Sequence, residues 1–140
     1  MNKAYLGNIS TGLPYCYGTF VNKSMAANAW TTFAPNILDS NFNFVVSGND
    51  IIIPSKGRWS VNVWSMNLTT APAANSQNVY RCVMGMRYQL PFSTPNLSLT
   101  PDLYFEHDVP SGTVFNFSVY LQAAQTGFSQ IPQFILKRIL

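Results

Sequence analysis

The sequence predicts an all-β protein, a jelly-roll sandwich of about 8–10 antiparallel strands. Short stretches of alternating apolar and polar residues, rich in aromatic and β-branched side chains, recur along the chain. Such alternation is typical of half-buried strands. Clusters of glycine, proline, asparagine and aspartate separate these stretches at intervals of roughly 8–12 residues, as turns do in sandwiches. The alanine-rich pieces that could form helices are short or interrupted by proline: 25–29, 71–74 and 123–124.

The first half of the expected sandwich is built from short strands and polar turns. A strand is expected where phenylalanine and valine alternate with polar residues in 41–46. The polar segment 47–50 then predicts a turn. The isoleucine triplet 51–53 predicts the next strand, which Pro54 ends, and a second turn is expected at 55–57.

Residues 58–68 give the clearest strand signal in the sequence. Apolar residues occupy alternate positions from Trp59 to Val63, and the alternation then shifts by one residue and continues from Trp64 to Leu68. A change of phase within a strand indicates either a β-bulge or a strand that is covered on both faces.

The second half repeats the pattern of strands and loops. Residues 80–90 alternate without a break and predict one long strand with two distinct faces. Polar, proline-bearing loops are expected on both sides of it, at 69–78 and 91–101. The remaining expected strands are 103–106, 115–122 and 133–140, with a turn at 109–112.

The first 28 residues differ from the rest of the chain, because only short apolar stretches separate their glycine- and proline-bearing turns. We interpret residues 1–28 as an N-terminal arm or an irregular first strand pair, and residues 29–140 as the β-sandwich domain. No apolar stretch of the kind found in secretory signals precedes polar Asn8, so no export signal is expected.

The composition fits a single domain with an unusually uncharged surface. The chain has 140 residues, of which 9% are charged and 47% hydrophobic, whereas about 25% charged residues is normal. Some apolar area is therefore expected to face a partner, which suits a subunit of an assembly better than a freely diffusing enzyme. No apolar stretch approaches the roughly 18 residues of a transmembrane helix, so membrane insertion is not expected.

Charge and cysteine patterns exclude further classes of protein. The eight lysines and arginines are dispersed along the chain, and a nucleic-acid-binding protein would concentrate them on one face. Cys16 and Cys82 form neither a zinc motif nor a redox motif. We expect two free, buried thiols, with a single disulfide as the alternative in an oxidising compartment.

No catalytic or metal-binding motif stands out. His107 is the only histidine. Glu106 and Asp108 flank it and are expected to share one face of a strand. They could bind a hard cation such as calcium, although a solvated loop is the favoured interpretation, and a pH-responsive His107 at an interface is a further alternative. The sequence contains no nucleophile elbow and no phosphate-binding loop, so we expect no enzyme, no cofactor and no metal.

The order of motifs from residue 30 onward is more informative. A polar turn, a short apolar strand and a proline occupy 47–54, and a glycine–aromatic strand follows at 57–63. A glycine turn then leads into an alternating strand at 108–119, and a Phe–Ser pair at 128–129 precedes a terminal apolar strand. This order resembles the tumour necrosis factor (TNF)/complement globular-head superfamily. The resemblance implies a trimer-forming jelly roll, of a kind that also occurs in phage and viral structural proteins.

Aromatic residues occupy both phases of several predicted strands. The outer face of a sandwich sheet is normally polar, so rings on both faces indicate that one sheet packs against a neighbouring copy. Ordinary half-exposed strand tyrosines are the alternative for two of the candidates, Tyr104 and Tyr120. The candidate oligomer-interface residues are Trp59, Trp64, Tyr104, Phe117 and Tyr120.

Two functions are consistent with these features. The first is a structural protein of a virion: a capsid, decoration, spike or fibre subunit that forms a homotrimer, with a pentamer as the alternative. Its arm over residues 1–28 would dock on other virion proteins. The second is a receptor- or glycan-binding head of a phage tail or spike, in which the loops 69–78 and 91–101 supply amides. The missing export signal disfavours an extracellular cytokine-like ligand.

Overall fold

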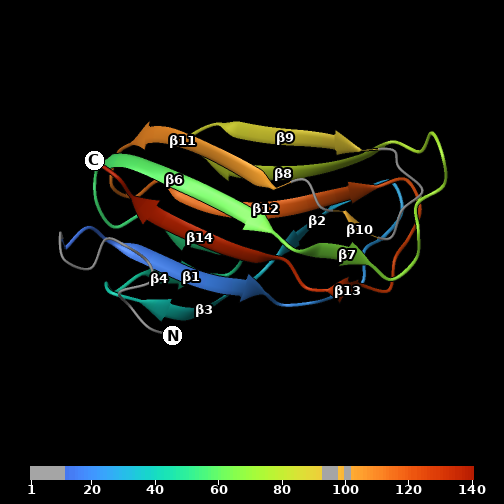
Figure 1. Cartoon of the computed structure of the whole chain (residues 1–140), viewed down its shortest axis with the longest axis horizontal. Helices are drawn as coiled ribbons and strands as arrows, with labels where there is room; N and C mark the ends of the chain where they lie inside the picture. Colours follow the sequence, from blue (N-terminus) through green and yellow to red (C-terminus); the bar gives the residue numbers. More distant parts are fainter. Residues whose placement is uncertain (1–11, 93–97, 100–101) are drawn as a thin grey trace.

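The computed structural model describes residues 12–92, 98–99 and 102–140. Two antiparallel sheets face each other in a sandwich, and a small third sheet lies at one end (Figure 1). Strands that are neighbours in a sheet are mostly not consecutive in the chain, because the chain crosses repeatedly between the two large sheets. The five-stranded sheet contains, in order, β11 (Leu103–Val109), β6 (Gly57–Trp64), β14 (Gln133–Arg138), β1 (Tyr15–Phe20) and β3 (Pro35–Ser40).

The six-stranded sheet is centred on β12, which pairs with three other strands. The six-stranded sheet contains β4 (Val45–Ser47), β5 (Asp50–Ile52), β12 (Val114–Leu121), β8 (Asn78–Met84) and β9 (Arg87–Phe92) in order, with β2 (Ala29–Phe33) also paired to β12. The three-stranded sheet contains β10 (Ser98–Leu99), β7 (Met66–Leu68) and β13 (Phe128–Gln130).

The predicted all-β class is confirmed. The described part of the chain forms strands, turns and loops and contains no helix. It therefore also has no helix with the length and apolar character that a membrane span requires.

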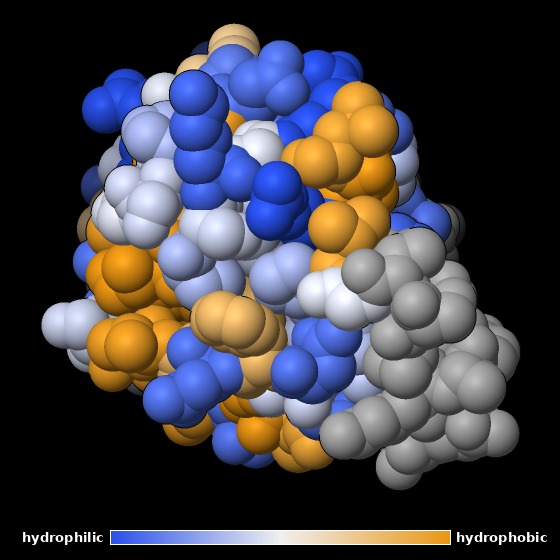
Figure 2. Space-filling model, turned by 90° about the vertical axis from the view of Figure 1, so that its left-hand side faces the viewer, coloured by the Kyte–Doolittle hydropathy of each residue, from blue (hydrophilic) through white to orange (hydrophobic). Residues whose placement is uncertain are grey.

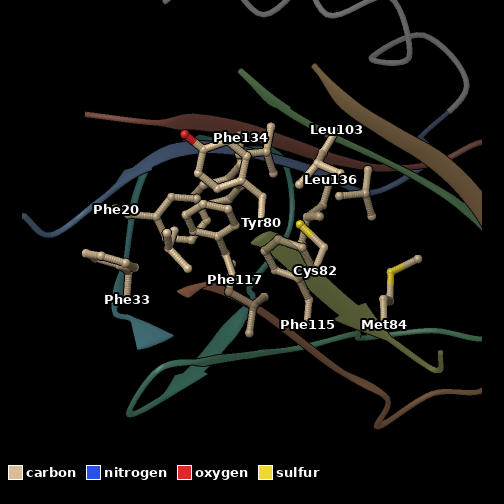
Figure 3. Packing of buried hydrophobic residues seen from close by; sticks show 14 of the residues in the cluster. Phe20, Phe33, Tyr80, Cys82, Met84, Leu103, Phe115, Phe117, Phe134 and Leu136 are labelled. Carbon is tan, nitrogen blue, oxygen red and sulfur yellow. The ribbon is translucent and has the colours of Figure 1, made fainter. Parts of the chain in front are cut away.

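The core lies between the two large sheets and is rich in aromatic rings. In Figure 3, Phe20, Phe134 and Leu136 of the five-stranded sheet meet Phe115 and Phe117 of the six-stranded sheet. The Phe20 ring lies 4.9 Å, centroid to centroid, from both Phe117 and Phe134. Each such side chain contributes about 1.5–3 kcal/mol when it is removed from water, so this cluster is a main source of stability.

The phase shift in residues 58–68 marks the junction of two strands in different sheets. Ser65 has a φ angle of 64° and separates β6 from β7. Inward-facing residues before it belong to the main sandwich, whereas β7 pairs with β10 and β13 in the small sheet. A left-handed residue at the junction turns the chain and moves the apolar side chains to the other phase. The change of phase thus reflects a break between two strands rather than a bulge or a doubly covered strand.

The prediction of a single long strand over residues 80–90 is wrong. The chain instead forms a hairpin of β8 and β9, in which Val83 pairs with Arg87. Gly85 lies in the loop between them with a φ angle of 75°, a conformation that glycine adopts without strain. The alternation continues through the loop, so periodicity alone did not reveal the turn.

The boundary of the N-terminal arm also requires correction. Residues 15–20, expected within the arm, form β1 and lie inside the five-stranded sheet, hydrogen-bonded to β14 on one side and β3 on the other. Buried Cys16 and Phe20 pack in the core. The second half of the predicted arm therefore belongs to the sandwich, whereas residues 1–11 lie outside the described residues.

Smaller differences concern the ends of strands. In the expected strand 41–46, only β4 forms, starting at Val45, while Phe44 packs edge-on against Trp59 at 6.0 Å between ring centroids. The expected strand 103–106 continues to Val109 as β11. The turns at 47–50 and 109–112 are confirmed, and each contains a glycine with positive φ.

Apolar side chains reach the surface in several places. Figure 2 views the end of the sandwich where the carboxyl terminus lies, and apolar patches there alternate with hydrophilic areas. This surface agrees with the low charge content of the sequence. The large apolar side chains that are most exposed are Val21, Trp30, Leu38, Phe42, Val45, Val46, Met86, Tyr104, Ile131 and Leu140.

Candidate oligomer interface

Two of the five predicted interface residues, Trp59 and Phe117, lie in the core of the chain itself. Both side chains are 0% exposed. Trp59 Nε1 donates a hydrogen bond of 3.0 Å to the backbone oxygen of Ser55, and Phe117 packs against Phe20 and Phe33. The prediction is corrected for these two residues, because a side chain that is buried between the sheets presents no surface to a neighbouring copy.

The structure brings two of the other candidates, Trp64 and Tyr104, to the outer face of the five-stranded sheet. Tyr104 pairs with Asn62, two residues before Trp64, and adjacent inward positions such as Val63 are buried. Tyr104 is 58% exposed. Trp64 is partly exposed, and its ring centroid lies 6.3 Å from that of Tyr17 on β1.

One row of paired residues crosses this outer face. Tyr17, Ile135, Asn62 and Tyr104 are consecutive partners on β1, β14, β6 and β11. We call the face formed by this row and Trp64 the aromatic face. All five side chains are partly or fully exposed, and two of the four row members are tyrosines, which combine a large apolar ring with a polar hydroxyl. Such residues are enriched in protein interfaces.

Alternation along β1 places Tyr17 on this face, because Cys16 and Phe20 point into the core. The pairing of β1 with β3 shifts register between Tyr17 and Gly18. A Cβ atom at Gly18 would collide with the backbone oxygen of Asn36, so only glycine lets β3 approach at this point. The Tyr17 hydroxyl donates a hydrogen bond of 3.1 Å to Gln133 Oε1, which fixes its ring beside Trp64.

An unpaired acceptor lies in the middle of the aromatic face. Asn62 Oδ1 is buried and has no hydrogen-bond partner among the described residues. Leaving a buried polar atom unpaired costs about 1–3 kcal/mol. A donor from another molecule that covered this face would remove that cost only if the amide turned its oxygen outward, because the chain itself covers this oxygen.

Charged groups border the aromatic face along β11 and β6. Arg58 Nε donates to Glu106 Oε1 at 3.1 Å, and Arg58 Nη1 donates to Asp108 Oδ2 at 3.2 Å. The Tyr104 hydroxyl donates to Glu106 Oε2 at 2.7 Å. The hydrogen bond from Tyr104, and after it the one from Arg58, lowers the pKa of Glu106. The hydrogen bond to Glu106 in turn raises the pKa of Arg58.

The contacts of Arg58 occupy the two carboxylates, Glu106 and Asp108, that were considered as ligands for a cation. The two carboxylates do share a face, but the guanidinium of Arg58 lies between them. His107 lies on the opposite side of β11, with its ring 6.5 Å from Tyr88. Among the residues that the structure describes, no three histidine, cysteine or acidic side chains come together as metal ligands.

The fifth candidate, Tyr120, lies on the outer face of the other large sheet. Its ring centroid is 5.6 Å from that of Trp30 on β2. Tyr120 therefore does not belong to the aromatic face, and the five predicted residues do not form one surface.

Sequence reasoning missed Tyr17, Ile135 and Asn62. Residues 133–138 alternate clearly, with Phe134 and Leu136 in the core, so Ile135 could have been placed on the outer face. Tyr17 was hidden because its segment was interpreted as an arm.

The two cysteines lie in the core as free thiols. Burial raises the pKa of both Cys16 and Cys82 well above the usual value. Neither thiol is therefore suited to nucleophilic chemistry.

No family model matches the sequence, and no curated protein matches it. Solved structures do match. The vertex protein P5 of PRD1 has a TM-score of 0.70 and 17% sequence identity, and the match covers 91% of this chain and 97% of that one. Two structures of murine APRIL, a TNF-family protein, have TM-scores of 0.62 and 0.63 at 10% identity, covering 89% of this chain and 98% of theirs. The fold is a TNF-like jelly roll. The expected fold is thus confirmed.

Proposed function

We propose that this protein is a structural protein of a phage virion, a capsid, decoration or spike subunit that self-assembles through its TNF-like jelly roll. The observation that carries the proposal is the likeness to the PRD1 vertex protein P5, which spans 91% of this chain and 97% of that one. The low charge content and the exposed aromatic residues support the proposal, since both favour association of subunits over a monomer in solution. The proposed role requires no catalysis.

The proposed assembly is a homotrimer held together by the aromatic face. The resemblance to the TNF superfamily implies three copies, with five as the alternative. Tyr17, Ile135, Trp64 and Tyr104 supply the apolar surface. Asn62 would supply an acceptor for a donor of the neighbouring copy once its amide turns the buried oxygen outward. The paired charges of Arg58 and its two carboxylates would lie at the rim, where water remains.

The proposed contact with other virion proteins is made by the N-terminal arm. Because β1 belongs to the sandwich, the arm is limited to the residues before it. A deletion that tests this role must therefore leave Tyr15–Phe20 intact, and residues 2–11 are a suitable segment to remove.

Two measurements test the proposal. Size-exclusion chromatography with light scattering at micromolar concentration should give the mass of three chains, and mass spectrometry of purified phage particles should detect the protein. Deleting residues 2–11 should leave the trimer intact and prevent incorporation into particles. A monomer in solution together with absence from particles would overturn the proposal, while normal incorporation of the deletion variant would overturn the role of the arm.

A receptor- or glycan-binding head is the second candidate, and one cavity favours it. A cavity of about 480 Å³ is lined by Ser76, Gln77, Asn78, Val79, Pro91 and Phe92, at the described edges of the two loops expected to recognise sugars. The Phe92 ring stacks on Tyr80 at 4.5 Å. However, Asn78 already bonds Ser76 Oγ and the backbone nitrogen of Gln122, so few of its polar atoms are free for a ligand. Binding on a glycan array that Phe92→Ala abolishes would support this candidate.

A further inference from the structure

The outer face of the six-stranded sheet carries an arginine stacked on a tryptophan. Arg81 on β8 reaches across β12, and its guanidinium carbon lies 3.8 Å from the centroid of the Trp30 ring on β2. Ser118 is the β12 residue that pairs with Arg81, and its small side chain leaves room for the crossing. Ser118 is in turn fixed by Thr32, whose hydroxyl lies 2.8 Å from its own. The stack is therefore held in place from three strands.

This arginine lacks the partners that a partly buried cation normally has. Arg81 Nε is buried without a hydrogen-bond partner, and its guanidinium forms no ion pair within the described residues. Burial lowers the pKa of Arg81, and the positive charge of Arg87 lowers it further. Arg58 on the opposite sheet shows the contrast, since two carboxylates bind it. The Trp30 ring is thus the partner that the described residues offer this cation, and no carboxylate among them compensates its charge.

The surroundings of the stack are apolar and positively charged. Val79 and Val83 alternate with the inward residues of β8 and lie on the same outer face, as do Tyr120 and Val114 of β12. Asp50 on the neighbouring strand β5 accepts a hydrogen bond of 3.0 Å from Asn116 Nδ2. A partner that complements this surface must bring its own negative charge together with apolar side chains.

We propose that this surface, formed by Trp30, Val79, Arg81, Val83 and Tyr120, docks an acidic segment of a partner protein. A carboxylate of the segment pairs with the guanidinium of Arg81 through two parallel hydrogen bonds, which is the geometry that guanidinium and carboxylate favour. Apolar side chains beside that carboxylate cover the valines and the exposed edge of Trp30. The inference does not depend on the proposed trimer, because the aromatic face lies on the other sheet.

Sugars and nucleic acids fit the surface less well. A sugar ring stacks on an open aromatic face, but Arg81 already covers the face of Trp30. A nucleic acid would be held by a row of cations along its backbone, whereas this face offers Arg81 and Arg87 within apolar surroundings. A carboxylate in a protein segment satisfies both the charge and the apolar area.

The test is a selection of binding peptides from a random twelve-residue library displayed on phage, with the purified full chain as bait and Arg81→Gln as the counter-bait. The expected result is enrichment of sequences that carry aspartate or glutamate next to apolar residues. The enriched peptides should lose at least about tenfold in affinity toward Arg81→Gln. Lys56→Gln, which removes one positive charge elsewhere on the surface, should leave their affinity unchanged.

Three further readouts make the outcome decisive. Thermal melting of Arg81→Gln should match the wild type, which shows that the variant is folded. Arg81→Lys should restore only part of the affinity, because an ammonium lacks the second parallel hydrogen bond. In NMR spectra of the wild type, the Nε–H signal of Arg81 should shift when a selected peptide is added. Absence of acidic peptides from the selection, equal binding to Arg81→Gln, or binding of sialyllactose or a DNA oligonucleotide at this face in place of peptides would overturn the proposal.

Discussion

The hydroxyl of Tyr104 donates a hydrogen bond of 2.7 Å to Oε2 of Glu106, while Arg58 holds the other oxygen of the same carboxylate at 3.1 Å. Both contacts favour the ionised carboxylate, so the pKa of Glu106 lies below its usual value. The folded chain therefore binds fewer protons at this site than the unfolded chain. Its stabilising effect is complete above the unfolded pKa and is lost as the pH falls through the folded one.

Replacing Glu106 should flatten the acid side of the stability curve. The melting temperature of the wild type should fall more steeply between about pH 5 and about pH 2 than that of Glu106→Gln. Tyr104→Phe removes one of the two hydrogen bonds and should give an intermediate slope. Scanning fluorimetry across this pH range measures the change in melting temperature. The difference between the proteins should be small, because Glu106 and Arg58 are partly exposed to solvent. Identical slopes for the three proteins would contradict it.

A charge placed on the aromatic face should dissociate the oligomer without unfolding the subunit. Tyr104→Asp puts a carboxylate where a neighbouring copy would bury it, at a cost of about 3 kcal/mol, so the dissociation constant should rise at least about 100-fold. The matched control is Tyr120→Asp on the opposite sheet, which should leave the mass in light scattering unchanged. If Tyr120→Asp dissociates the oligomer and Tyr104→Asp does not, the interface lies on the other sheet.

The sequence was sufficient to predict a strand or a turn where clean alternation or turn-forming residues marked it. The turn at 47–50 and the strand that became β12 were predicted because a glycine-bearing polar segment or a clean alternation marks each of them. The turn at Gly85 was missed because methionines flank the glycine, and neither asparagine nor aspartate marks the turn. β1 was missed because its glycine and two tyrosines obscure the alternation.

The interface residues were harder to predict. Alternation shows that two aromatic side chains lie on opposite faces of a strand, but it does not show which face is buried until the partners of the strand are known. Phe117 and Tyr120 differ in phase, yet the sequence predicts both as interface residues, and the structure places Phe117 in the core and Tyr120 on the outer face. Trp59 and Trp64 also differ in phase, but nothing in the sequence says which phase of β6 faces the core. Tyr17 and Tyr104 lie on strands that β14 and β6 separate, and that arrangement follows only from the tertiary fold.

Gly85 should tolerate alanine less well than another glycine of similar backbone angle. Its φ angle is 75°, and an added Cβ would lie 3.0 Å from Val109 Cγ1 and 3.1 Å from His107 Cδ2. Gly48 has a φ angle of 60°, and no atom of the described residues lies within 4 Å of the added Cβ. Gly48→Ala should lower the free energy of unfolding by about 1 kcal/mol and Gly85→Ala by about 2–3 kcal/mol, measured by urea denaturation. Equal losses would contradict the packing of the hairpin against β11.

Phe117→Ala should destabilise the subunit itself. The ring packs between Phe20 and Phe33 and is 0% exposed, so the free energy of unfolding should fall by about 3–5 kcal/mol. Urea denaturation in the Tyr104→Asp background separates this effect from assembly. Tyr120→Ala in the same background should change stability by no more than about 1 kcal/mol. Comparable losses in the two variants would contradict the placement of Phe117 in the core.

A substitution at Asn62 tests the role of the aromatic face in assembly without introducing a charge. In a single subunit its Oδ1 is buried with no hydrogen-bond partner among the residues that the structure describes. Asn62→Leu should therefore leave the unfolding free energy of the Tyr104→Asp monomer unchanged or raise it, because the leucine removes this unpaired acceptor. In the otherwise wild-type oligomer the same change removes the acceptor that a neighbouring copy would use. The dissociation constant, measured by analytical ultracentrifugation, should then rise about tenfold. A destabilised monomer with unchanged association would mean that the amide serves the subunit alone.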